Sequence, residues 1–467
     1  MIDIKKHILS KSYFMDIAKA ASDLNIEAFI VGGYIRDLIL ERKLDDVDIL
    51  IIGDGVEFAK TLASKLGVEN IAIYKNFRTA HFKYLGIDFE FVGARKESYA
   101  VDSRNPEVEA GTFDDDIDRR DFTINTIALS LNASNIGEIV DKYKGVEDIQ
   151  NKLIKTPLDP EHTFSDDPLR IMRAFRFASQ LNFTLDKKLF ESTSKMAERL
   201  EIISKERITD EFMKILGSPK PSIGLKLLYN SGAMKYVFSE ISNLGGVDQR
   251  NDFHHKDVFL HTCQVVDNIA QVSDDVWLRF AGLVHDIAKP QTKRFDEKIG
   301  WTFHGHEELG ARMMKSIFKK MKLPFSKLDY IRKLVRLHLR PLALVSDTVT
   351  DSAIRRFVVS IGEDLEDMIA LCRADITSKN PVKVTQYLAN YDKVMEKVRE
   401  VREKDKLREF QSPVRGDEIM EICGIPASKT VGEIKSAIEE AILDGEIGNN
   451  YDEALAFLLK IKDNYVK

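Results

Sequence analysis

The chain has 467 residues, of which 44% are hydrophobic and 31% are charged, and its formal net charge is −6. This composition is ordinary for a globular protein, and the length predicts about three domains. A mildly acidic chain exerts no general attraction on polyanions, so contact with a nucleic acid must come from local basic patches. No apolar run approaches the ~20 residues that span a bilayer, and the first residues do not resemble a signal peptide. Together with three widely spaced cysteines, which we interpret as reduced thiols, these features predict a cytoplasmic protein without a membrane partner.

The first strong pattern is a strand, a glycine turn, a helix and a second strand. The apolar run at residues 27–31 ends at Gly32 and Gly33, residues 34–40 are helical by pattern, and residues 47–52 predict the next strand. Glycines at such a turn let backbone amides approach a phosphate closely, and the helix N-terminus adds a favourable dipole. The turn therefore predicts a phosphate site, although a glycine-rich turn alone is a weak signal.

Acidic residues mark two of the predicted strands. Asp46 and Asp48 point to the same side, because side chains alternate along a strand. Two carboxylates on one face can hold a pair of hard cations over a triphosphate, whereas the alternative is a solvated acidic strand end. The strand at residues 87–92 alternates acids with apolar residues and offers Glu90 as a third carboxylate, with Asp88 as the alternative on the same face.

A basic motif follows, Arg119-Arg120-Asp121-Phe122-Thr123-Ile124-Asn125, and it opens an apolar run. Arginine forms bidentate bonds with phosphate oxygens, and Asn125 can bond to a ribose hydroxyl. Residues 94–113 between the third carboxylate and this motif predict a long polar loop, which we expect to close over the nucleotide.

Six motifs follow one another in a fixed order over the first half of the chain. They are Gly32-Gly33-x-x-Arg36-Asp37, Asp46-x-Asp48, Glu90-x-x-x-x-Arg95, Arg119-Arg120-Asp121-Phe122-Thr123-x-Asn125, Asp166-Asp167-Pro168-Leu169-Arg170-x-x-Arg173-Ala174-x-Arg176-Phe177 and Ser204-Lys205-Glu206-Arg207-Ile208-x-x-Glu211. In order and spacing they resemble the head of the class II tRNA nucleotidyltransferases, or CCA-adding enzymes, which the bacterial poly(A) polymerases share. The template motif of that family usually begins Glu-Asp, whereas this one begins Asp-Asp.

The resemblance implies an α+β fold, with a polymerase β-like nucleotidyltransferase head on a mixed sheet and an all-α neck. It implies template-independent addition of CMP and AMP to the 3′ end of tRNA. The partners would be tRNA, CTP and ATP, and Asp46, Asp48 and Glu90 would be catalytic, with Mg²⁺ at the two aspartates. The residues that it assigns to the nucleotide are Gly32, Gly33, Arg36, Arg119, Arg120, Asp121, Asn125, Asp167, Arg170, Arg173 and Arg176.

The fifth motif predicts how a nucleobase is chosen. Asp167 and Arg170 lie three apart on a predicted helix and would share one face. An acid and an arginine side by side offer acceptors and fixed donors that can pair with the edge of C or A. The alternative is that Asp167 caps a helix that starts at Pro168 and pairs with Arg170.

The second half of the chain contains seven of the ten histidines, between His254 and His338. The string Leu283-Val284-His285-Asp286-Ile287-Ala288-Lys289-Pro290 and the flanking histidines resemble the HD superfamily of metal-dependent phosphohydrolases, in the variant that can bind two metals. The resemblance assigns the metal ligands to His261, His285, Asp286, His306, His338 and Asp375, with His304 as a neighbour. Imidazole and carboxylate ligands suit one or two ions of Mn, Ni, Co, Fe or Zn more than Mg. The alternative is that this domain docks tRNA or forms a homodimer.

Breaks between the motifs predict four parts: a head at 1–150, a neck with the templating helix at 151–245, an all-α HD domain at 250–380, and a small helical tail at 381–467 that could contact tRNA. The basic stretch at residues 315–340 is interpreted as a solvated helical face rather than an RNA track. Two rival functions were weighed. A poly(A) polymerase is disfavoured because residues 76–82 lack a double basic pair. An HD phosphohydrolase with a nucleotide-sensing head is disfavoured by the intact acidic and arginine motifs.

Overall fold

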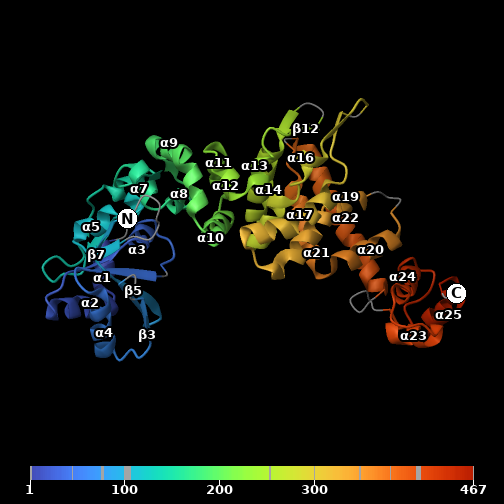
Figure 1. Cartoon of the computed structure of the whole chain (residues 1–467), viewed down its shortest axis with the longest axis horizontal. Coiled ribbons are helices and arrows are strands. Elements are labelled where there is room, and N and C mark those ends of the chain that lie inside the picture. Colours follow the sequence, from blue (N-terminus) through green and yellow to red (C-terminus); the bar gives the residue numbers. More distant parts are fainter. Residues whose placement is uncertain are drawn as a thin grey trace. The chain divides into compact units, whose positions relative to one another are not determined.

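The structure is a computed structural model that describes residues 3–44, 46–74, 78–98, 107–251, 254–298, 300–345, 349–378, 380–405 and 412–465. The chain forms two compact units, Met1–Ser242 and Asn243–Lys467 (Figure 1). The first unit contains the predicted head and neck motifs, and the second contains the predicted histidine ligands.

A mixed sheet forms the centre of the head. Its strands are β1 (Ala28–Val31), β2 (Asp46–Ile51), β3 (Ile71–Tyr74), β4 (Thr79–Tyr84), β5 (Ile87–Gly93), β8 (Ala128–Ser130) and β9 (Ile139–Val140). They lie in the order β3-β4-β5-β2-β1-β8-β9, in which β2 and β5 are parallel and the other neighbours are antiparallel. The mixed sheet predicted for the head is confirmed.

Burial changes along β2, and the end that carries Asp46 is accessible. All of β1 is buried, whereas β2 changes from an exposed Asp46 to a buried run that ends at Ile51. Helices around the sheet are α1 (Ile4–Leu9), α2 (Ser12–Asp23), α3 (Gly33–Ile39) and α4 (Gly55–Leu66). Asp46 and Asp48 therefore lie at the end of β2 where the strand changes from exposed to buried, and the buried residues that follow fix their position.

The prediction of a loop throughout residues 94–113 is wrong at both ends. Strands β6 (Arg95–Ser98) and β7 (Glu107–Ala110) form an antiparallel ribbon there. A mostly polar ribbon lacks the alternation of apolar residues that marks a half-buried strand, so the sequence carries little signal for it. Residues 99–106 lie outside the described part of the chain.

The rest of the first unit is helical, except for the two-residue strands β10 (Leu153–Ile154) and β11 (Thr184–Leu185). The helices are α5 (Phe113–Asp118), α6 (Gly145–Gln150), α7 (Pro160–Asp166), α8 (Leu169–Leu181), α9 (Lys187–Met196), α10 (Lys205–Leu216), α11 (Pro221–Asn230), α12 (Met234–Val237) and α13 (Ser239–Ser242). Helix α8 packs against α10 and α11, and ten of its 13 residues are buried. It is therefore the central helix of the neck.

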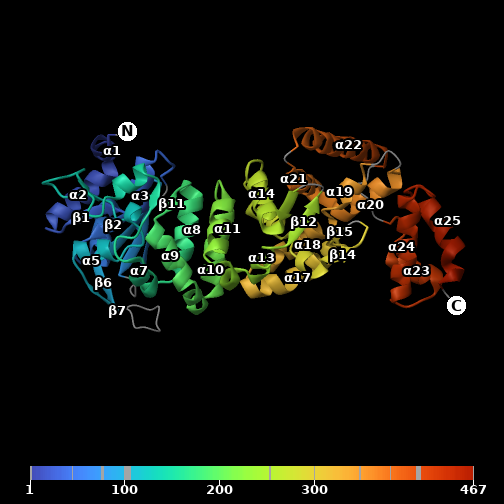
Figure 2. The same ribbon diagram turned by 90° about the horizontal axis from the view of Figure 1, so that it is seen from above.

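The second unit is also mainly helical, as predicted (Figure 2). Its larger part contains α14 (Val258–Ala270), α15 (Val276–Val284), α16 (Lys289–Thr292), α17 (His306–Met321), α18 (Leu328–Leu337), α19 (Arg340–Ala343), α20 (Asp351–Ile361), α21 (Leu365–Asp375) and α22 (Pro381–Asp405). Two antiparallel ribbons, absent from the all-α prediction, accompany these helices: β12 (Asp248–Asn251) with β13 (His254–Asp257) before α14, and β14 (Arg294–Asp296) with β15 (Gly300–Thr302) between α16 and α17.

The C-terminal segment has a small core of its own. It comprises α23 (Gly416–Cys423), α24 (Lys429–Leu443) and α25 (Tyr451–Ile461), packed around Ile434, Ile438 and Leu458. Among the described helices, none is long and apolar enough to cross a membrane.

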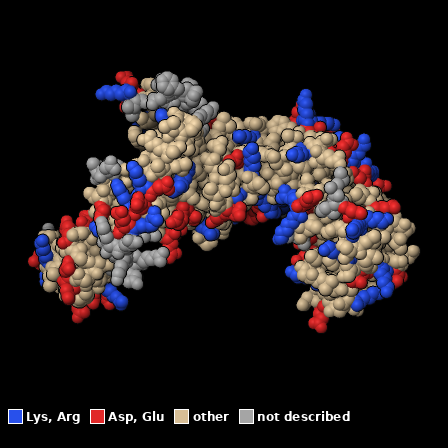
Figure 3. All heavy atoms as spheres, turned by 180° about the vertical axis from the view of Figure 1, so that it is seen from behind, with Lys and Arg blue, Asp and Glu red and all other residues tan. Residues whose placement is uncertain are grey.

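The basic stretch at residues 315–340 is partly neutralised by neighbours. Lys333 Nζ lies 2.6 Å from Asp364 Oδ2, and Arg336 Nε lies 2.7 Å from Glu308 Oε2. On the face of the molecule seen in Figure 3, basic and acidic side chains are intermixed. The two ion pairs favour the solvated helical face over an RNA track.

Candidate active site and metal centre

The turn between β1 and α3 requires glycine. Gly32 has a φ of +78°, a conformation that L side chains rarely adopt. A Cβ atom at Gly32 would lie 3.1 Å from Asp48 Oδ2 and 3.4 Å from Arg120 Nη1, and one at Gly33 would lie 3.3 Å from Arg36 Nη2. The absence of a side chain therefore leaves the backbone open between an acidic and a basic group.

Carboxylates from β2 and β5 are brought together by parallel pairing. Asp48 lies opposite Glu90, and Asp46 lies opposite Asp88. Burial raises the pKa of Asp48 to about 6. Repulsion from Glu90 and Asp46 adds to this effect, and attraction by Arg120 opposes it. Crowded negative charge of this kind is relieved by a bound cation, so the residues fit a divalent metal with oxygen ligands.

The two acids of β5 have different neighbours. Asp88 makes ion pairs with His81 Nε2 at 3.3 Å and Lys83 Nζ at 3.5 Å. Glu90 instead faces a hollow of about 290 Å³, whose lining residues are Asp48, Tyr74, Thr79, Glu90, Val92, Arg95, Arg119 and Arg120. The geometry therefore favours Glu90 over Asp88 as the third carboxylate beside the hollow.

Asp116 anchors the arginine pair, and the sequence interpretation did not assign it a role. Its fully buried carboxylate accepts bonds from Arg119 Nε at 2.9 Å and from Arg120 Nη2 at 2.9 Å. Burial opposes ionisation of Asp116, but the two guanidinium groups outweigh it and lower its pKa. The signal available was the spacing, since acids three and four residues before an arginine share its face of a helix.

Arg36 and Asn125 bond to each other rather than lining the hollow. Arg36 Nη1 donates to Asn125 Oδ1 at 2.8 Å, and Asn125 Nδ2 donates to Asp121 Oδ1 at 2.9 Å. Arg173 Nε completes the network by donating to Asp121 Oδ2 at 2.8 Å. Burial would raise the pKa of Asp121, but Arg173 and the bond from Asn125 lower it to about 2. This network joins α3 of the head to α8 of the neck.

The predicted shared helix face of Asp167 and Arg170 is wrong. Asp167 precedes α8 in extended conformation, because the helix begins only after Pro168. The Asp167 carboxylate accepts the Leu169 amide at 3.1 Å and lies 3.3 Å from Arg207 Nη2. The expected helix start at Pro168 agrees with the structure, in which Pro168 is the N-cap residue of α8, but the expected cap by Asp167 is wrong, because Asp167 lies one residue before that position.

Arg170 and Arg176 of α8 are buried against groups that only the folded chain brings near. Arg170 Nη2 donates to the carbonyl of Arg119 at 2.6 Å, and Arg176 Nη1 pairs with Glu211 Oε1 at 2.8 Å. Arg170 therefore does not make the pairing with Asp167 that the alternative interpretation expected. Instead, Arg170 ties the neck to the backbone of the arginine pair.

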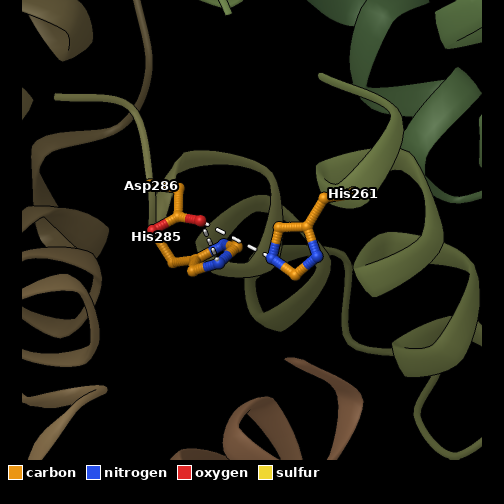
Figure 4. Close-up of side chains that lie close together, drawn as sticks. All are labelled: His261, His285 and Asp286. Carbon is orange, nitrogen blue, oxygen red and sulfur yellow. Dashed lines mark ion pairs between the residues drawn. The ribbon is translucent and has the colours of Figure 1, made fainter. Parts of the chain in front are cut away.

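Six predicted ligands converge in the second unit, and we call them the HD centre. They come from five helices or their ends: His261 from α14, His285 and Asp286 after α15, His306 from α17, His338 after α18 and Asp375 from α21. Figure 4 shows His261, His285 and Asp286 pointing toward one another. The neighbour His304 is exposed.

Each imidazole of the HD centre has its Nδ1 atom engaged elsewhere. Nδ1 of His285 lies 2.8 Å from the carbonyl oxygen of Gly282. Nδ1 of His306 lies 2.7 Å from the carbonyl oxygen of Phe303, and Nδ1 of His338 lies 2.7 Å from that of Val335. Nδ1 of His261 lies 2.9 Å from the Thr377 hydroxyl. These bonds orient the rings with Nε2 toward the centre, as in histidine ligands of metals.

Asp286 lies between two groups of ligands. Its Oδ2 is 3.1 Å from His285 Nε2 and 3.5 Å from His261 Nε2, whereas its Oδ1 is 3.2 Å from His306 Nε2 and 3.9 Å from His338 Nε2. Asp375 Oδ1 lies 2.8 Å from His261 Nε2. One carboxylate shared by two ligand groups fits one or two metal ions.

Protonation in the HD centre also fits a metal. Burial lowers the pKa of His338 to about 4, so its imidazole is neutral at pH 7. Burial opposes ionisation of Asp286, but His285 and Lys289 hold its pKa well below its usual range. Lys289, to which the sequence interpretation gave no role, lies 2.6 Å from Asp286 Oδ2. Burial opposes protonation of His285, but Asp286 and Asp375 raise its pKa to about 10, so the imidazole must release its Nε2 proton to bind a metal, as histidine ligands of metals do.

Comparisons with known proteins agree with this arrangement. Residues 28–155 match the family described as "Poly A polymerase head domain", residues 182–244 match "Probable RNA and SrmB- binding site of polymerase A", and residues 258–373 match "HD domain". The A-adding tRNA nucleotidyltransferase of Deinococcus radiodurans is 32% identical over 74% of this chain and 79% of its own. The chain belongs to the tRNA nucleotidyltransferase family.

Other members of this family extend the match along the chain. The CC-adding tRNA nucleotidyltransferase of Thermus thermophilus is 28% identical and covers 93% of both chains. The Bacillus stearothermophilus CCA-adding enzyme in complex with CTP has a TM-score of 0.66 at 24% identity, covering 96% of this chain and 97% of its own. The Thermotoga maritima CCA-adding enzyme complexed with tRNA has a TM-score of 0.60 at 19% identity, covering 96% and 94%. At these identities the structural likeness establishes the fold alone.

Proposed function

We propose that this tRNA nucleotidyltransferase transfers CMP and AMP from CTP and ATP to the 3′ end of tRNA. The observation that carries the proposal is the placement of Asp48 and Glu90 in one hollow with Arg119 and Arg120. Fixed carboxylates and guanidinium groups around one space are what phosphoryl transfer from a triphosphate needs. The names of the relatives, which include a multifunctional CCA protein at 34% identity, support C and A as the added nucleotides.

The carboxylates, the arginines and the glycine turn have separate roles in the proposed nucleotidyl transfer. Asp46, Asp48 and Glu90 would hold two Mg²⁺ ions, which supply Lewis-acid stabilisation of the charge on the attacking and leaving oxygens. Arg119 and Arg120 donate to phosphate oxygens, and Asp116 keeps both of them in position. Gly32 leaves its backbone accessible to the triphosphate. The reaction then depends on orientation and charge stabilisation rather than on a covalent intermediate.

Base selection is proposed for the start of α8. Asp167 offers a carboxylate beside Arg207, and Arg170 is held by the backbone of Arg119. This bond supports the proposal because it ties base-reading residues to the arginines that hold the phosphates. The nucleotide-binding roles of Arg36, Asp121, Asn125, Arg173 and Arg176 are proposed to be indirect, through the network that fixes α3 to α8.

A second activity is proposed for the HD centre. One or two ions of Mn, Ni, Co, Fe or Zn would be held by its four imidazoles and two carboxylates and would make a bound water nucleophilic. We propose an RNA-end phosphate as substrate, such as a 2′,3′-cyclic phosphate, because hydrolysis of its P–O3′ bond leaves the phosphate on O2′ and frees the 3′-hydroxyl that the head extends. The proposed division of labour is a head at 1–150, a neck at 151–245, an HD domain at 250–380 and a tRNA-contacting tail at 381–467. A cytoplasmic location is proposed from the three free cysteines.

Defined tRNA substrates test the polymerising function. Purified protein is incubated with labelled CTP or ATP and with tRNAs that end before CCA, after the first C, or after both Cs. Incorporation of C, C and A in turn supports full CCA addition, whereas C alone or A alone identifies a CC-adding or A-adding enzyme. Long A tails would instead support a poly(A) polymerase, and no incorporation with any tRNA would contradict the proposal.

The rival functions have less support. The relatives with high coverage are named as tRNA nucleotidyltransferases, which favours tRNA over a poly(A) product. Asn76 and Phe77, part of the segment used to argue against a poly(A) polymerase, lie outside the described residues. A head that only senses nucleotides is disfavoured by the carboxylates and anchored arginines around one hollow.

A further inference from the structure

Two large aromatic side chains are exposed on the ribbon formed by β14 and β15. Phe295 and Trp301 lie opposite each other in the antiparallel register, with ring centroids 5.1 Å apart and planes at 72°. Phe295 is 58% exposed and Trp301 is 39% exposed. Lys293 Nζ lies 4.4 Å from the centroid of the Trp301 ring. The ribbon thus presents two rings and a cation to solvent.

The ribbon leads directly into the HD centre. Strand β15 is followed by Phe303, whose carbonyl accepts Nδ1 of His306 at 2.7 Å. Lys289 Nζ lies 5.6 Å from the Phe303 ring centroid and 2.6 Å from Asp286 Oδ2. Phe303 and Lys289 therefore continue the series of rings and ammonium groups from the exposed ribbon to the metal ligands His306 and Asp286.

The composition of this surface favours nucleic acid over a protein partner. Exposed rings accompanied by lysine or arginine stack unpaired bases, at about 1–3 kcal/mol per base. The two half-exposed rings offer on the order of 200 Å², since an aromatic side chain buries about 150–250 Å² in full. A stable protein interface needs about 800 Å² per partner. The pair is thus far too small to hold a second copy of the chain by itself, but large enough for one or two bases.

We propose that Phe295 and Trp301 form a stacking platform for the last unpaired bases of a single-stranded RNA end, whose terminal phosphate enters the HD centre. Lys293 and Lys289 attract the phosphates of the same strand. The platform supplies specificity for an RNA chain, because small phosphoesters have no base to stack. Its purpose rests on the hydrolytic function proposed above, but binding to it does not require turnover.

Tryptophan fluorescence tests the platform directly, since the chain has only two tryptophans, Trp277 and Trp301. Trp277 packs on Phe280 and Phe318, with ring centroids 6.0 and 6.2 Å apart, so Trp277→Phe keeps an aromatic ring there and leaves Trp301 as the sole reporter. Titration of this full-length variant with a ten-nucleotide single-stranded RNA should quench the fluorescence in a saturable way. Adding Phe295→Ala should weaken the binding about 5- to 150-fold, the equivalent of one stacked base.

Two controls make the result decisive. Val272→Ala removes a 70% exposed apolar side chain outside the ribbon and should leave the RNA affinity unchanged. Trp301→Phe in the otherwise native chain should abolish the RNA-dependent signal. The proposal is overturned if RNA causes no quenching, or if Phe295→Ala binds as tightly as its parent. It is also overturned if the fluorescence changes with protein concentration alone and sedimentation shows a dimer that Phe295→Ala abolishes, since the ribbon is then an interface between copies.

Hydrolysis assays separate the platform from the proposed activity. On metal-loaded protein, Phe295→Ala should lower kcat/KM about 5- to 150-fold for an RNA ending in a 2′,3′-cyclic phosphate. Hydrolysis of the small ester bis(p-nitrophenyl) phosphate should not change. If the wild-type protein hydrolyses neither substrate, the hydrolytic function fails, whereas the fluorescence titration still decides whether the platform binds RNA. An equal loss on both substrates would contradict a stacking role.

Discussion

Replacing Asp116 by asparagine should disable the two arginines that are proposed to bind phosphate, without removing them. The fully buried carboxylate receives two bonds from each of Arg119 and Arg120. Asp116→Asn removes the charge and leaves one acceptor oxygen for two guanidinium groups. Breaking a fully buried ion pair costs about 3–5 kcal/mol, and the arginine side chains here are 20% and 16% exposed. We therefore expect the arginines to lose about 2–3 kcal/mol of the stabilisation that holds them in position. The same loss of transition-state stabilisation lowers kcat/KM for both CTP and ATP about 30- to 150-fold.

Asp115 provides a matched control on the same helix. Its carboxylate accepts the Thr112 amide at 2.8 Å in a capping box and does not contact the arginines. Asp115→Asn should cost up to about 1 kcal/mol of stability and leave single-nucleotide incorporation unchanged. Both variants are assayed with saturating tRNA, and their melting temperatures are recorded. The reasoning is refuted if Asp116→Asn melts like wild type and retains kcat/KM within threefold.

Three further variants test the remaining assignments. Asp48→Asn should abolish incorporation yet raise the melting temperature of the metal-free protein at pH 7. Because the pKa of Asp48 is raised from 3.8 to about 6 on folding, the stability of the native protein falls as pH rises through this interval and stays lower above it, whereas asparagine carries no charge. A lower melting temperature of Asp48→Asn would contradict this reasoning. Replacing both Asp167 and Arg170 should blur selection among CTP, ATP, GTP and UTP more than it weakens triphosphate binding. An equal loss for all four, with unchanged discrimination, would leave these residues only a structural role. Asp286→Ala should remove both bound metal, measured by mass spectrometry, and phosphoesterase activity, while CMP and AMP addition to an intact tRNA end continues; a parallel loss of addition would show that the two activities are not separable.

Short-range patterns explain which parts of the fold could be predicted. The turn at Gly32 depends on neighbouring residues, because positive φ and close backbone approach are local demands for glycine. The pairing of Asp48 with Glu90 was harder, since parallel strands meet only through the sheet. Their common chemistry nevertheless pointed to one site. The HD ligands were assigned through the resemblance to a known superfamily, although they are spread over more than one hundred residues of the chain.

Contacts made only in the folded chain explain what could not be predicted. The bond from Arg170 to the carbonyl of Arg119 joins residues 51 positions apart, and no sequence pattern near Arg170 predicts a backbone partner. Asp116 is spaced suitably for Arg119 and Arg120, but Asp115 also lies four residues before Arg119, and only the folded chain shows that Asp115 caps the helix while Asp116 is buried against the arginines. The ribbon with Phe295 and Trp301 is similarly invisible to periodicity, because each strand is only three residues long, which is too short to show an alternation of apolar residues.

The two metal-binding regions should respond differently to chelation, because their donor atoms differ. The head offers carboxylate oxygens, which suit Mg²⁺, whereas the HD centre offers four imidazoles, which suit transition metals. Burial opposes ionisation of Asp375, but His261 and His285 hold its pKa well below its usual range, so this carboxylate is ionised and available to a metal at neutral pH. Dialysis against 1,10-phenanthroline should therefore remove the HD metal and phosphoesterase activity, and nucleotide addition should persist in excess Mg²⁺. If addition is lost as well and only Mn²⁺, Ni²⁺ or Co²⁺ restores it, the assignment of a hard cation to Asp46 and Asp48 is wrong.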